Sequence, residues 1–147
     1  MKEFKVQSDS IYFIDTNIWL YSFIQSQHTK KTKIAGAIIQ ECDIVISTQI
    51  VNEMCVNLIK KAHFSESDIQ KLITSLFRKF TILELSRSIL SKASQIREKH
   101  SFSFWDSIVA ASALDCDADF LISEDMQNNF NLESKLTIVN PFSSNQS

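Results

Sequence analysis

Glycine and proline are almost missing from this chain of 147 residues, which contains only Gly36 and Pro141. Ordinary proteins contain about 7% glycine and about 5% proline. The glycine-rich loops that hold phosphate in dinucleotide-binding and P-loop proteins therefore cannot be built here. Collagen-like, linker-like and proline-rich chains are excluded for the same reason, and so is a turn-dense β-sandwich. If the protein acts on phosphate groups, it does so without a glycine loop.

Cysteine pairs and long apolar runs are also missing. Cys42, Cys55 and Cys116 are widely spaced and form no Cys-x-x-Cys motif, which predicts reduced, buried thiols rather than disulfides or zinc ligands. The polar N-terminus lacks the apolar core of a signal peptide, and no run approaches the ~18 apolar residues of a membrane span. We therefore expect a cytoplasmic protein without a membrane segment.

The composition is that of one soluble globular domain, with 44% hydrophobic and 22% charged residues. We expect the domain to span residues 1–141 and to be followed by a short tail, residues 142–147. A net charge of −2 argues against a broad basic face for duplex DNA. His28, His63 and His100 share no metal-ligand spacing.

Short apolar runs alternate with longer helical patterns along the chain. The runs are continuous rather than alternating, as expected for strands buried on both faces, and they cover residues 11–14, 44–46, 81–83, 120–122 and 136–139. Between them, apolar residues recur at helical spacing within residues 34–38, 51–59, 69–77, 89–96 and 105–114. This order predicts an α/β fold with three layers, in which helices cover both faces of a mostly parallel sheet.

Ligands bind at the carboxyl ends of the strands in such sheets, and acidic residues follow two of the predicted strands directly. Asp15 comes after the first strand, and Ser123, Glu124 and Asp125 come after the fourth. Taken singly, each acid is explained as well by a helix cap or a turn. Their common position at strand ends makes a shared site the stronger interpretation.

Asp106 and Glu53 are two further candidates. Ser103-x-x-Asp106 fits a capping box at the start of a helix that is apolar on all sides, so we expect its first turn to point into the protein. A carboxylate there needs a partner or a metal ion. Glu53 follows the second strand, but it lies opposite the apolar stripe of its helix, where a solvated glutamate is the default.

Carboxylates that converge repel one another, and a divalent cation offsets this repulsion. Oxygen ligands alone select a hard ion such as Mg²⁺ or Mn²⁺. The acids taken together are therefore consistent with a metal site, for which Glu53 is the weakest candidate beside Asp15, Asp106 and Asp125.

Four motifs resemble those of PIN-domain ribonucleases, and within that superfamily the VapC-type toxins of bacterial toxin–antitoxin modules. The motifs are Tyr12-Phe13-Ile14-Asp15-Thr16-Asn17, Ile46-Ser47-Thr48-Gln49-Ile50-Val51-Asn52-Glu53, Ser103-Phe104-Trp105-Asp106 and Ala118-Asp119-Phe120-Leu121-Ile122-Ser123-Glu124-Asp125. The resemblance implies that the four acids form the active site, with Asn17 and Ser123 as polar support. The resemblance makes Glu53 a stronger candidate for the site than its position on the helix indicates.

The resemblance further implies Mg²⁺- or Mn²⁺-dependent hydrolysis of single-stranded RNA, a cognate antitoxin and a homodimer. Relatives carry glycines in the loop before the fourth strand and after the fourth acid, whereas this chain has Asp115, Asp117, Asn128 and Asn129 there. Asn and Asp accept left-handed backbone angles better than most residues, so we expect them to form these turns.

Three alternatives stay open at this stage. The chain could be a non-catalytic interaction module whose acids are only caps, or a housekeeping nuclease rather than a toxin. A Mg²⁺ phosphatase with Asp15 as nucleophile is disfavoured, because such enzymes carry Asp-x-Asp and this chain has Asn17. Without the four site acids the net charge becomes +2, with basic clusters around Lys30, Lys60, Arg78 and Arg97, which permits weak, salt-sensitive RNA binding.

Overall fold

The computed structural model describes residues 4–24 and 29–143, and His28 lies outside these ranges. Six strands form one sheet in the order β3-β2-β1-β4-β6-β5. All neighbouring pairs are parallel except β5 and β6. The strands are β1 (Ile11–Ile14), β2 (Asp43–Ser47), β3 (Thr81–Leu83), β4 (Phe120–Ile122), β5 (Asn131–Leu132) and β6 (Leu136–Val139).

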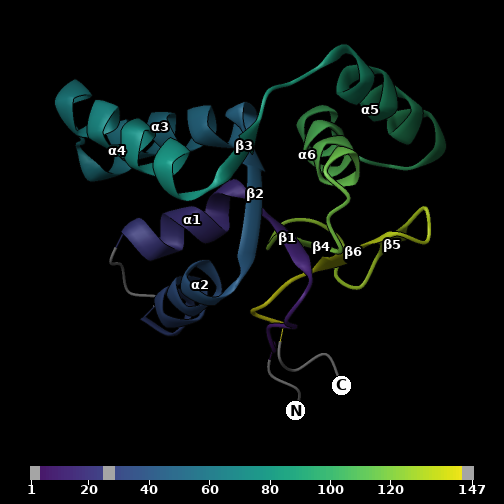
Figure 1. Ribbon diagram of the computed structural model, residues 1–147, viewed down its shortest axis with the longest axis horizontal. Coiled ribbons are helices and arrows are strands. Elements are labelled where there is room, and N and C mark those ends of the chain that lie inside the picture. The colour runs from purple at the N-terminus through teal and green to yellow at the C-terminus, as the bar shows by residue number, and fades with distance from the viewer. Residues whose placement is uncertain (1–3, 25–28, 144–147) are drawn as a thin grey trace.

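Six helices pack on this sheet, and the α/β class with a mostly parallel sheet is confirmed. They are α1 (Thr16–Phe23), α2 (Thr29–Glu41), α3 (Thr48–Ala62), α4 (Glu66–Lys79), α5 (Arg87–Lys99) and α6 (Phe104–Asp115). Helices α1 to α4 group on one side of the central strands, and α5 and α6 group on the other (Figure 1). None of the helices in the described ranges combines the length and apolar character that a membrane span requires.

All five predicted strands are confirmed, and β1 lies at the centre of the sheet with β2 and β4 on either side. Strand β5 was not predicted, because two residues at the sheet edge leave no apolar run in the sequence. The capping box at Ser65 and Asp68 begins α4 as expected. The division into a domain of residues 1–141 and a tail stays a prediction, and Phe142 packs its ring edge-on against Tyr21 at 5.3 Å.

Helix α6 agrees only in part with the expectation that it is buried on all sides. The stretch from Ser107 to Ala113 is buried throughout. The first turn does not point into the protein, because Phe104 and Trp105 are 55% and 60% exposed. Ser103 caps the helix by accepting a hydrogen bond from the backbone N–H of Asp106 at 3.2 Å. A helix that begins at the surface can expose its first turn while its middle crosses the core.

Polar residues replace glycine at the tight turns. Asp117 and Asn129 have φ angles of 56° and 63°, which confirms two of the four expected turn residues. Asp115 instead ends α6, and Asn128 accepts a hydrogen bond from the backbone of Asn140 at 2.8 Å. His63 (φ 57°) forms the left-handed C-cap of α3, a position that glycine usually occupies.

The only glycine of the chain occupies the interior of a helix, where its flexibility has no structural use. A Cβ added to Gly36 in α2 meets no atom within 4 Å. We therefore expect Gly36→Ala to raise the free energy of unfolding by about 0.5–1 kcal/mol. Urea unfolding followed by circular dichroism measures this, with the exposed neighbour Ala37→Gly as the reverse control. A loss of stability in Gly36→Ala would contradict the assignment.

Candidate acidic site

The four predicted acids lie around the carboxyl ends of the three central strands. Asp15 follows β1 and caps α1, and Asp125 follows β4 in the loop behind it. Glu53 lies on α3, which begins directly after β2, and Asp106 lies in the first turn of α6. Since β2, β1 and β4 are parallel neighbours, their carboxyl ends meet at one edge of the sheet.

Asp15 is the most buried of these acids, with 8% of its surface exposed. Its Oδ1 accepts a hydrogen bond from the backbone N–H of Thr16, and its Oδ2 accepts one from Ser123 Oγ, both at 2.8 Å. Ser123 is fully buried, so this bond joins the ends of β1 and β4 inside the protein. The capping role and the site role of Asp15 therefore coexist.

Burial raises the pKa of Asp15 to about 6. The hydrogen bonds from Ser123 and Thr16 act in the opposite direction, and the negative charges of Asp106 and Glu53 raise the pKa further. Three carboxylates from separate parts of the chain thus repel one another electrostatically. Such mutual repulsion marks a place where a positive charge is favourable.

Glu53 faces this edge of the sheet, which its helical pattern did not indicate. Its Oε1 accepts a hydrogen bond from Thr16 Oγ1 at 2.7 Å, and its Oε2 accepts one from Gln49 Nε2 at 3.2 Å. Sequence reasoning missed Thr16 and Gln49 as partners. Both stood inside the quoted motifs, but neither carries a charge that would single it out.

Asp125 is exposed and is held by Asn17, whose Nδ2 donates to Asp125 Oδ2 at 2.8 Å. The other amide atom, Asn17 Oδ1, is buried and has no hydrogen-bond partner among the described residues. The backbone N–H of Asp125 donates to Ser123 Oγ at 3.3 Å. Asn17 and Ser123 thus hydrogen-bond to Asp125 and Asp15, and their role as support for a functional site stays a prediction.

Asp106 is half-buried at the start of α6. Burial raises its pKa, its hydrogen bond with Ser103 lowers it, and the charges of Asp125 and Glu53 raise it again. Asp106 is thereby coupled to Glu53 and Asp125, and Asp15 is coupled to Asp106 and Glu53. Charge repulsion thus links all four acids around the ends of the central strands.

The donor chemistry of this cluster suits a hard divalent cation, since every candidate ligand is a carboxylate or amide oxygen. Within residues 4–24 and 29–143, however, no three acidic, histidine or cysteine side chains converge closely enough to hold an ion. Hydrogen-bond donors from Thr16, Ser123 and Asn17 occupy carboxylate oxygens instead. The unpartnered Asn17 Oδ1 and Gln49 Oε1 leave two further buried oxygen donors beside the acids. The oxygen atoms present are therefore of the kind that binds a hard divalent cation. To enclose such a cation, the side chains would have to shift.

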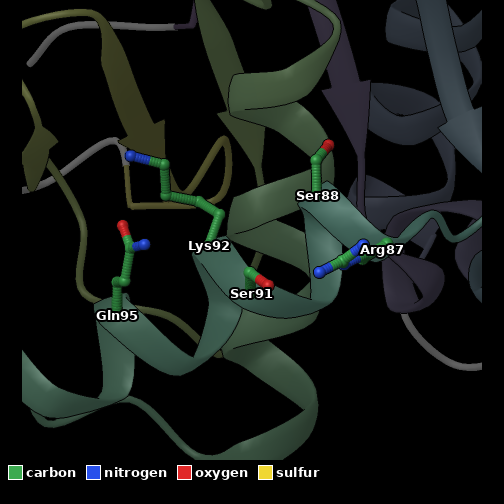
Figure 2. A pocket seen from close by; sticks show the side chains of 5 residues that line it. All are labelled: Arg87, Ser88, Ser91, Lys92 and Gln95. Atoms are coloured by element: carbon green, nitrogen blue, oxygen red, sulfur yellow. The ribbon is translucent and has the colours of Figure 1, made fainter.

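Other candidate sites are weaker. An open depression of about 560 Å³ on α5 is lined by Arg87, Ser88, Ser91, Lys92 and Gln95, and none of the four acids lines it (Figure 2). Its lysine pairs with Glu133 at 3.0 Å. No reactive thiol is present in the described ranges, because burial raises the pKa of Cys42 to about 12 and of Cys116 to about 11, and it also raises the pKa of Cys55.

Acidic side chains thus lie around the carboxyl ends of the central strands of a parallel α/β sheet, the place where ligands bind in such folds. The PIN domain family model matches residues 12–129, and the chain belongs to this family. PIN domains are generally nucleases that depend on divalent metal ions. A comparison with functionally curated proteins finds no match.

Solved structures share the fold at low sequence identity. A toxin–antitoxin complex from Klebsiella pneumoniae is 21% identical with a TM-score of 0.68, and the match covers 89% of this chain and 98% of that one. VapC20 of Mycobacterium tuberculosis, a toxin that cleaves the sarcin–ricin loop, is 12% identical with a TM-score of 0.63, and the match covers 75% and 86% of the two chains. FitAcB from Neisseria gonorrhoeae is 17% identical with a TM-score of 0.62, and the match covers 90% and 99%.

Proposed function

We propose that the protein is a metal-dependent endoribonuclease that hydrolyses phosphodiesters in single-stranded RNA. The carrying observation is the cluster of Asp15, Glu53, Asp106 and Asp125, in which burial and mutual repulsion raise the pKa values of Asp15 and Asp106. Bare carboxylates repel an RNA phosphate. A hydrolase with this site therefore needs a cation between its acids and its substrate.

In this proposal Asp15, Asp106 and Asp125 hold the ion, together with Glu53 or through a water that Glu53 orients. When bound, Mg²⁺ or Mn²⁺ would lower the pKa of a water and neutralise charge on the phosphate. The protein's own groups fix the acids: Ser123 and the Thr16 N–H orient Asp15, and Asn17 orients Asp125. Glu53 or Asp106, where it does not touch the ion, can accept the proton of the attacking water.

The toxin role is part of the proposal. The solved structures with this fold include several toxin–antitoxin complexes. We infer by this likeness a cytoplasmic toxin with a cognate antitoxin that covers the acidic site with a basic side chain, and a homodimer. A housekeeping nuclease would have the same site, and the absence of an antitoxin gene beside this one would favour it.

RNA cleavage is expected to require both the ion and Asp106. We expect the purified protein to cut single-stranded RNA in Mg²⁺ or Mn²⁺, to lose activity with EDTA, and to regain it when excess metal is added. Asp106→Asn should lower the rate about 100-fold or more, because it removes an acid whose charge or proton transfer acts in the transition state. Gel analysis of labelled RNA measures both effects. Cleavage that survives EDTA would refute metal dependence.

The two alternatives that are not nucleases predict other results. An interaction module whose acids are only caps would cut no RNA with any metal. A phosphatase using Asp15 would release phosphate from small phosphate esters, and it is disfavoured because such enzymes carry an acid where this chain has Asn17.

A further inference from the structure

Two aromatic rings stand exposed beside the acidic site, at the start of α6. Phe104 and Trp105 lie edge to face, with ring centroids 5.2 Å apart and planes at 78°. Both side chains are more than half exposed, and Asp106 follows them directly. Nearby aromatic residues are used differently, because Phe102 packs against Phe130 at 5.7 Å and is half-buried. The exposed pair therefore has no role in the core.

The first turn that carries these rings is fixed to the acids and to α5. The carbonyl of Trp105 accepts a hydrogen bond from Gln49 Nε2 at 3.4 Å, and the same nitrogen donates to Glu53. Ser107 Oγ, which is fully buried, donates to the carbonyl of Phe104 at 2.5 Å. The backbone beneath the two rings thus has a defined position relative to Glu53 and Asp106.

A cation completes this surface. The guanidinium of Arg97 on α5 lies over the ring of Phe104, with its carbon 4.3 Å from the centroid, and donates to Ser107 Oγ at 2.6 Å. In the described part of the chain Arg97 forms no ion pair with a carboxylate. The aromatic faces and the unpaired charge match the two parts of a nucleotide, its base and its phosphate.

The exposed area argues against a protein partner as the occupant. An aromatic side chain offers about 150–250 Å² in full, so two half-exposed rings provide roughly 200–300 Å². A stable protein interface buries about 800 Å² on each partner. The other large exposed apolar side chains of the described residues lie on other helices: Phe23 on α1, Val56 and Ile59 on α3, Phe77 on α4 and Leu90 on α5.

We propose that Phe104 and Trp105, with Arg97 against the Phe104 ring, form a stacking platform for a nucleobase of the RNA substrate next to the cleaved phosphate. This inference rests on the proposed nuclease function and adds a substrate contact to it. Because Gln49 Nε2 bonds both the carbonyl of Trp105 and the carboxylate of Glu53, a base on this ring belongs to a nucleotide adjoining the acids. Stacking accepts any base, so the platform provides affinity and position rather than a sequence code.

Tryptophan fluorescence reports this contact directly, because the chain has two tryptophans and the other, Trp19, is 1% exposed. An Asp15→Asn protein, which leaves RNA intact, is titrated with a single-stranded oligouridine and with an abasic oligomer of equal phosphate number. We expect the RNA to quench Trp105 and the abasic oligomer to leave its emission unchanged. Trp105→Ala in this background should weaken RNA binding about 10-fold, whereas Trp105→Phe should keep most of the affinity.

Phe77→Ala is the matched control, because Phe77 is 52% exposed on α4 and lies outside the platform. It should bind RNA like its parent. In the active protein, Trp105→Ala should raise KM while leaving cleavage at saturating RNA within a few-fold.

Equal binding of the abasic oligomer, or unchanged RNA affinity in Trp105→Ala, would overturn the platform even where the wild type cuts RNA. Loss of self-association or of antitoxin binding with unchanged RNA affinity would overturn it too, and would assign the rings to a protein contact. Conversely, Trp105-dependent binding by a wild type that cuts no RNA would support the platform and refute the nuclease.

Discussion

Replacing Asp15 by asparagine is expected to lower RNA cleavage about 100-fold or more while leaving the protein folded. Asparagine is an equally good helix cap, so α1 should persist. The substitution removes the most buried carboxylate of the cluster, which no neighbouring acid can replace from its own position. Rates measured at saturating Mg²⁺ on a labelled single-stranded RNA test this, with circular dichroism to confirm the fold.

Asp43→Asn is the matched control. Asp43 is exposed and begins β2, at the opposite end of that strand from the helix that carries Glu53. The RNA cleavage rate of Asp43→Asn should equal that of the wild type. If Asp15→Asn kept more than about a tenth of the activity, Asp15 would be a cap and not a ligand, and the site would need a different centre.

The second large effect is a change with pH in the free energy of unfolding of the metal-free protein. The folded-state pKa of Asp15 is about 6, against an ordinary value of 3.8. The folded state therefore binds this proton more tightly than the unfolded state. The resulting stabilisation is complete below pH 3.8 and is lost as pH rises through about 6. The loss attributable to Asp15 is on the order of 2–3 kcal/mol by pH 7.5.

Urea unfolding at pH 5 and pH 7.5, without divalent ions, measures the part of this loss that falls between these two pH values, about half of it. The free energy of unfolding should fall across this interval in the wild type, and it should fall less in Asp15→Asn. At pH 7.5 the variant should be the more stable of the two metal-free proteins. Mg²⁺ should then raise the midpoint of the wild type more than that of the variant. Identical pH profiles for the two proteins would contradict the burial argument.

Much of the fold was predictable, because strands buried on both faces leave continuous apolar runs and helices leave a period of three to four residues. Both signals are local in sequence. The antiparallel β5 was missed because its pairing with β6 depends on the turn that comes after it, at Glu133 and Ser134. The φ angles of 56° at these two residues depend on the surrounding fold. The exposed first turn of α6 was mispredicted, since an apolar sequence does not say where a helix leaves the core.

The four acids of the candidate site could be named from the sequence, and Asn17 and Ser123 from the resemblance, whereas Thr16 and Gln49 could not. Asp15 and Asp125 follow strand ends, and topology alone places them together. Glu53 could not be placed by helical periodicity, because its partners Thr16 and Gln49 lie on α1 and on its own first turn. The resemblance to PIN-domain nucleases was needed to single it out. Uncharged side chains such as these become visible only when the contacts are known.

The central position of β1 sets when the acidic site can first exist. The bond between Asp15 and Ser123 spans 108 residues of sequence, and β1 pairs with β4 across the same interval. Such distant contacts form late, because the chain between them must be ordered first. During synthesis, Asp15 leaves the ribosome long before Ser123 and Asp125, and residues up to β4 are required before the cluster closes. A nascent chain that stops within α6 therefore contains Asp15 and Glu53 but lacks Ser123 and Asp125, so the acidic site is complete only after β4 has been synthesised.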